Sequence, residues 1–174
     1  MLARTRPALI MLLFAQIILL PNIAYAKRPP KCGEISRNDI RDAFDHAHDL
    51  RYFYDYDEDI ERLCAFMDEF EDWDDNVPRE LRRSDAYDDE KDALIERIEE
   101  HIDDLKTPLR MLHLWLRANT DTTYEFVLKE ARVRARRDDI DKTLVKLNED
   151  IQLIKDFMGR QDKKIVEQET INIP

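Results

Sequence analysis

Glycine is almost absent from this chain, with only Gly33 and Gly159 in 174 residues. Tight turns between β-strands depend on glycine or on Asn-Gly pairs, so this scarcity argues against a sheet. Charged residues make up 39% of the chain, which is typical of long helices with few connections. We therefore predict an all-α fold, an elongated antiparallel helical bundle of four to five helices with a long C-terminal coiled-coil-like helix.

The motifs of common catalytic sites are also missing. There is no Cys-x-x-Cys redox motif and no Glu-x-x-His of the di-iron type. Ser36 and Ser84, the two serines, each precede a helical pattern, where serine is a typical cap. Residues 55–59 resemble the start of a calcium loop, but Ile60 and Phe66 stand where that loop needs Gly and Glu. We therefore predict that the protein is not an enzyme.

Residues 1–26 have the three-part pattern of a secretory signal peptide. Two arginines are followed by an apolar run over residues 8–20 and by small alanines at positions 24 and 26. That run is shorter than the roughly 20 residues that cross a bilayer, and an uncleaved anchor is the alternative. We predict a mature chain that starts at Lys27, is periplasmic or secreted, and is not stably inserted in a membrane after cleavage.

Acidic residues outnumber basic ones, 39 to 28. They concentrate in residues 39–104, which hold 26 acids and 8 bases, whereas residues 105–174 hold 12 acids and 14 bases. Such a surface repels nucleic acid and attracts a basic protein partner. We predict an exported protein-interaction module, such as an envelope or secretion accessory factor, a chaperone or an immunity protein. The alternative is an acidic face that only keeps the protein soluble.

Two acidic stretches, residues 68–75 and 85–104, are the predicted contact face. The candidate partner-binding residues are Asp68, Glu69, Glu71, Asp72, Asp88, Asp89, Glu99 and Glu100. A basic cluster is expected to lie across from these acidic helices, with an anionic ligand as the alternative; it consists of Arg132, Arg134, Arg136 and Arg137.

Cys32 and Cys64 form the predicted disulfide, because a cysteine pair in an exported chain is typically oxidised. A straight helix from Ser36 to Cys64 would be about 42 Å long, whereas the four residues after Cys32 reach only about 13 Å. An intrachain bridge therefore requires a turn or kink within residues 55–59 and a lead-in that folds back along the first helix. An interchain bridge or two free thiols are the alternatives.

Helix boundaries divide the rest of the chain. We predict an extended lead-in over residues 27–35, a helical bundle domain over residues 36–159 and a flexible tail over residues 160–174. Pro78 is expected to end the second helix, and Pro108 either opens a helix or kinks a continuing one. Gly159 is the expected stop of the final helix, which would begin near Thr122.

The final helix carries a heptad pattern. Phe126, Val133, Ile140, Leu147 and Ile154 fall seven apart, with Leu144, Ile151 and Met158 at the alternate positions. The seam weakens upstream of residue 140, where charged residues take alternate positions. A second copy of the chain, binding along this helix, is therefore another predicted partner.

The alternative function is divalent-metal binding or sensing on the first helix. Its candidate ligands are Asp42, Asp45, His46, His48 and Asp49. Asp42, His46 and Asp49 share one helix face through spacings of four and three, and imidazole with carboxylate suits zinc, nickel or copper. No other cofactor is predicted. His113, in the apolar segment 109–116, is interpreted as a core histidine.

Overall fold

A computed structural model describes residues 28–118 and 131–171. They form helices and contain no strand, which confirms the predicted all-α class. The helices are α2 (Arg37–Asp49), α3 (Tyr56–Asn76), α4 (Arg79–Arg82), α5 (Asp85–Ala118) and α7 (Ala131–Ile171). The predicted signal segment lies outside the described residues.

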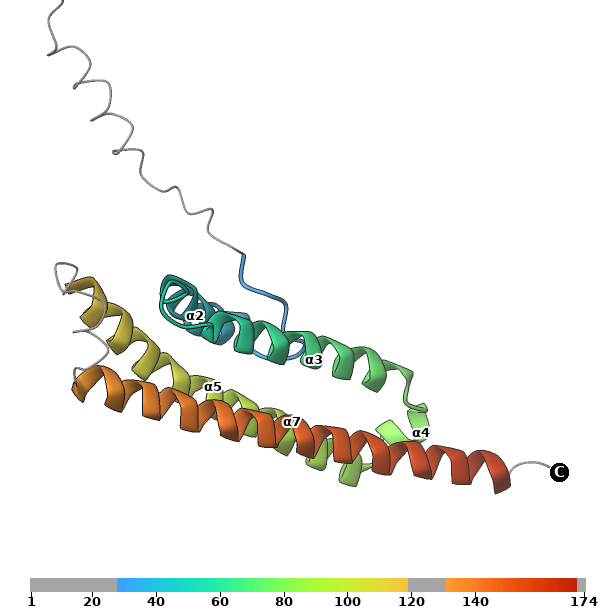
Figure 1. Ribbon diagram of the computed structural model, residues 1–174. Helices are drawn as coiled ribbons and strands as arrows, with labels where there is room; N and C mark the ends of the chain where they lie inside the picture. The colour runs from blue at the N-terminus through green and yellow to red at the C-terminus, as the bar shows by residue number, and fades with distance from the viewer. Residues whose placement is uncertain (1–27, 119–130, 172–174) are drawn as a thin grey trace, which may run out of the picture.

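The molecule is an elongated bundle built on the antiparallel pair α5 and α7 (Figure 1). At 34 and 41 residues, these helices are about 51 and 61 Å long. The shorter helices α2 and α3 lie over this pair, and α3 runs in the same direction as α7 (Figure 1). One apolar core runs between these helices. The acidic helix α3 is therefore held against the α5–α7 pair by buried apolar side chains.

The turn between α2 and α3 begins at Leu50, earlier than the predicted kink at residues 55–59. Backbone N–H groups of Phe53 and Tyr54 donate to the carbonyl of Leu50 at 2.8 and 3.1 Å. Residues 57–59 are the acidic first turn of α3, where carboxylates interact favourably with the positive end of the helix dipole. This acidic run therefore starts a helix and does not interrupt one.

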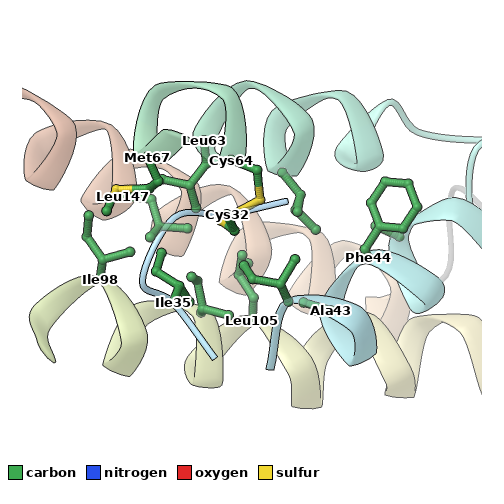
Figure 2. Packing of buried hydrophobic residues seen from close by; sticks show 14 of the residues in the cluster. Cys32, Ile35, Ala43, Phe44, Leu63, Cys64, Met67, Ile98, Leu105 and Leu147 are labelled. Atoms are coloured by element: carbon green, nitrogen blue, oxygen red, sulfur yellow. A yellow bond between two sulfur atoms is a disulfide. The ribbon is translucent and has the colours of Figure 1, made fainter. Parts of the chain in front are cut away.

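Cys32 and Cys64 are paired within the chain as a disulfide, with their Cα atoms 4.1 Å apart. Both are buried in the core between α3 and α5, close to Ile35 and Met67 (Figure 2). The lead-in therefore does fold back to reach α3, as an intrachain bridge requires.

The proline positions have different outcomes. α3 ends at Asn76, two residues before Pro78, as predicted. Pro108 is buried inside α5, so of its two interpretations the continuing helix is correct.

Along the described chain, no helix is long and apolar enough to cross a membrane.

The helix α7 does not stop at Gly159, and this prediction was wrong. It continues to Ile171 because residues beyond Gly159 pack on the bundle: Gln161 is buried, and Asp162 accepts a hydrogen bond from Trp73 Nε1 at 3.0 Å. Residues 160–171 are thus helix and not the predicted tail. The predicted helix start near Thr122, with Phe126, lies outside the described residues.

The buried stripe of α7 is wider than the predicted seam. Ile140, Leu147 and Ile154 are buried as expected, and the fully buried alternate positions include Asp150 and Phe157. The predicted alternates Leu144, Ile151 and Met158 are only partly buried. Leu144 and Ile151 line, with Ile60 and Leu63 of α3, a hollow of about 150 Å³. The stripe is wide because α7 packs on α5 and on α3 at once.

Candidate functional site

Two of the predicted partner-binding acids hold the lead-in in place. The backbone N–H of Gly33 donates to Asp68 on α3 at 2.8 Å, and that of Ser36 donates to Glu99 on α5 at 3.3 Å. Both carboxylates are partly buried. The lead-in is therefore fastened to α3 by the disulfide and Asp68, and to α5 by Glu99.

The other six predicted acids are exposed on α3 and α5, and we call them the acidic surface: Glu69, Glu71, Asp72, Asp88, Asp89 and Glu100. Asp89 and Glu100 are eleven residues apart, close to three helical turns, so they lie on one line along α5 about 16 Å apart. In the part of the chain that the structure describes, no side chain of the acidic surface forms an ion pair. These carboxylates therefore face solvent.

A buried network lies beneath this surface, where α3 meets the start of α5. The carboxylate of Asp74 accepts hydrogen bonds from the Tyr87 hydroxyl and, at 3.1 Å, from Lys91 Nζ. Lys91 also reaches Glu34 of the lead-in at 3.3 Å. Burial, together with the hydrogen bond to Asp74, raises the pKa of Tyr87 well above its usual value. Through Lys91 and Glu34, this network also joins the lead-in to α3 and α5.

A second buried carboxylate joins α5 to α7. Asp150 is fully buried and lies 2.5 Å from His101 Nδ1 and 2.5 Å from Arg97 Nε. Arg97 is about half exposed, with its side chain at 48%. The buried carboxylate of Asp150 thus has two hydrogen-bonding partners, both on α5.

The five predicted metal ligands fall on different sides of α2. His48 lies 3.1 Å from the buried Asp57 of α3, and Asp45 is exposed. Asp42 is exposed beside Arg41, at 3.5 Å. His48 and Asp45 therefore do not join His46 and Asp49.

His46 and Asp49 instead face His113 of α5, whose apolar neighbours in the sequence predict a core residue. The ring centroids of His46 and His113 are 5.7 Å apart, and His113 Nδ1 lies 3.3 Å from Asp49 Oδ2. Burial and the neighbouring His113 lower the pKa of His46. Among residues 28–118 and 131–171, no three acidic, histidine or cysteine side chains are already arranged to hold a metal ion.

The basic cluster does not lie across from the acidic helices as expected. Arg137 packs on the ring of Tyr54 in the α2–α3 turn, with its guanidinium carbon 4.8 Å from the ring centroid. Arg132 and Arg136 line a groove of about 340 Å³ with Met111 and Trp115 of α5. The cluster therefore lies at the end of the bundle where α5 ends and α7 begins. These two helix ends are close together because α5 and α7 are antiparallel.

Sequence reasoning missed the partners that depend on tertiary contact. Asp150 carries only a weak signal: it lies between the apolar positions Leu147 and Ile154 on the buried face of α7. Nothing in the sequence around His113 distinguishes a histidine that faces α2 from one that faces the core. Asp74, in a run of four acids and a tryptophan over residues 71–75, carries no signal that it alone is buried.

Binding chemistry is therefore available in two places, the acidic surface on α3 and α5 and the His46–His113 pair between α2 and α5. The first offers hydrated carboxylates to a large partner, and the second offers imidazole nitrogens to a small one. Comparison of the chain with protein-family models, curated proteins and solved structures found no match.

Proposed function

We propose that this chain is an exported helical module that binds a protein with a basic surface through its acidic surface. The observation that carries the proposal is the exposure of six carboxylates on α3 and α5 that form no ion pair with any other described residue. Carboxylates without an ion-pair partner keep most of their attraction for an incoming cation, since no direct contact neutralises them.

Charge distribution supports the same proposal. Residues 39–104 carry a net charge of −18, whereas residues 105–174 are close to neutral. The bases on α7 that reach α5 pair with acids outside the acidic surface, as Arg160 does with Glu90 and Lys146 with Asp104. The segment that contains α2, α3, α4 and most of α5 therefore attracts a basic partner more strongly than the rest of the chain.

Export to the periplasm or the exterior is part of this proposal. It is supported by the signal-like pattern of residues 1–26 and by the cysteine pair at disulfide distance, since disulfides persist in oxidising compartments. Cell fractionation with N-terminal sequencing tests it: the expected product is extracytoplasmic and begins at Lys27. A cytosolic product that keeps residues 1–26 would contradict export.

The binding proposal is tested by reversing charge on the acidic surface. The test variant carries Glu69→Lys, Asp72→Lys, Asp89→Lys and Glu100→Lys. It keeps Asp68 and Glu99, whose hydrogen bonds hold the lead-in. The matched control reverses four exposed acids of α7, Asp138, Glu149, Asp156 and Glu167, and changes net charge equally. Each protein is used to capture partners from an envelope extract at low and at high salt.

We expect the original chain and the α7 control to capture the same basic protein, and the acidic-surface variant to lose it. Salt should weaken capture, because exposed charges are screened within about 8 Å at physiological ionic strength. Equal capture by all three proteins would reject the acidic surface as the contact face.

A further inference from the structure

The four histidines of the chain divide into two kinds of environment. His48 and His101 each contact a buried aspartate, Asp57 and Asp150, at 3.1 and 2.5 Å. His46 and His113 have no such buried partner in the described chain and contact each other across the α2–α5 interface, with ring centroids 5.7 Å apart. The second pair is therefore the one whose nitrogens are not committed to a structural carboxylate.

His113 has an unexplained nitrogen. Its Nδ1 is buried, yet it makes no hydrogen bond within the described residues. Asp49 Oδ2 lies 3.3 Å away, but the orientation is not that of a hydrogen bond. A buried polar atom left without a partner is costly, and a water molecule or an ion is a common reason that one persists.

We propose that His46 and His113 bind one divalent transition-metal ion between α2 and α5, with Asp49 as the third ligand. Zinc lies about 2.0–2.1 Å from an imidazole nitrogen, which places the ring centroid roughly 3 Å from the metal. Two rings that share one ion have centroids about 5 Å apart at a tetrahedral angle and up to roughly 6 Å apart at wider angles, so the observed 5.7 Å requires the rings to close slightly around the ion. Imidazole with carboxylate is a donor set for zinc, nickel and copper.

Asp49 must turn toward the two rings to complete the site. Its side chain is 53% exposed, so a change of rotamer meets little resistance. That required movement agrees with the absence of a ready-made group of three ligands in the described chain. The expected affinity is therefore micromolar, because the site is only partly preorganised.

The charges around the pair both favour and oppose a cation. Asp42 and Asp49 act electrostatically on His46 with negative charge, and Arg110 acts with positive charge. Arg110 is exposed, so it can be replaced without disturbing the core. Removing its charge should strengthen metal binding severalfold.

Calorimetric titration of the tag-free chain with zinc, nickel and copper chloride tests the site. We expect one ion per chain, a loss of more than about tenfold in affinity for His46→Ala and for His113→Ala, and no change for His48→Ala, the matched control. Undiminished binding by either of the first two variants, or no binding of any of the three ions, would overturn the proposal.

A second measurement does not depend on variants that alter the α2–α5 interface. Paramagnetic Ni²⁺ added to the unmodified chain should broaden the NMR signals of the His46 and His113 rings before those of His48 and His101. Preferential broadening of His48 or His101 would place the ion elsewhere and reject the site. The acidic-surface variant should bind metal like the original chain. Failure of the metal site would therefore leave the proposed partner surface untouched, and the reverse also holds.

Discussion

Gly33 lies against the backbone of Met67: a Cβ atom at Gly33 would be 2.7 Å from the carbonyl oxygen of Met67. Gly33 also has a φ of +53°, a conformation that costs other residues roughly 1–2 kcal/mol. These two constraints allow the lead-in to pass close to α3, where Asp68 and Cys64 hold it.

Gly33→Ala should therefore destabilise the protein by about 2 kcal/mol or more, from the positive φ and the backbone clash together. The control is Gly159→Ala. Gly159 lies inside α7 with nothing within 4 Å of an added Cβ, so alanine there should stabilise by up to about 1 kcal/mol. Urea unfolding of the two variants measures both effects, and the expected signs are opposite.

Reduction of the Cys32–Cys64 disulfide should lower the free energy of unfolding by roughly 3–4 kcal/mol. The cysteines are 32 residues apart. Opening a loop of that length raises the conformational entropy of the unfolded chain, which lowers its free energy by this amount. Unfolding measured with and without reductant gives the value, and Cys32→Ser with Cys64→Ser is the genetic equivalent. A midpoint that reductant does not move would contradict an intrachain bridge.

Asp150→Ala should cost about 3–5 kcal/mol, because it removes one partner of a buried charged network and leaves His101 unpaired. Arg97→Ala should cost far less, since Arg97 is about half exposed and its charge stays hydrated. Denaturant unfolding of the two single variants tests this asymmetry. Equal losses would mean that the Arg97–Asp150 contact alone accounts for what the buried carboxylate contributes to the α5–α7 interface.

Stability should fall as the pH rises above about 10. Burial raises the pKa of Tyr87 and of Tyr56 above the usual value of 10.0. In this range the unfolded chain loses protons that the folded chain keeps, so unfolding becomes easier, by up to about 1.4 kcal/mol per pH unit for each group. Tyr87→Phe should reduce that slope between pH 10 and 11.5, and an unchanged slope would exclude Tyr87 as a contributor.

Much of the fold could be predicted from periodicity and from a few special residues. The scarcity of glycine indicated helices, Pro78 marked the end of α3, and the distance between Cys32 and Cys64 required a turn. These features act locally or through simple lengths, so a sequence reveals them. The position of that turn could not be predicted. The acidic run at residues 55–59 has no hydrophobic period and therefore resembles a turn, although it starts α3.

The remaining differences come from tertiary packing, which the sequence does not display. Gly159 is a good local stop signal, but the contacts of Gln161 and Asp162 with the bundle outweigh its low helix propensity. His113 was assigned to the core because its neighbours are apolar, whereas its ring faces His46. In both cases the deciding contact is made with a residue distant in the sequence, Trp73 for Asp162 and His46 for His113.

The disulfide also determines how the molecule would carry mechanical load. Tension on a segment that precedes Cys32 passes through the two sulfur atoms directly into the middle of α3, so α2 sits in a covalently closed loop that bears none of it. After reduction the same pull would act first on Gly33 and Ser36, and α2 would be the next element to unravel.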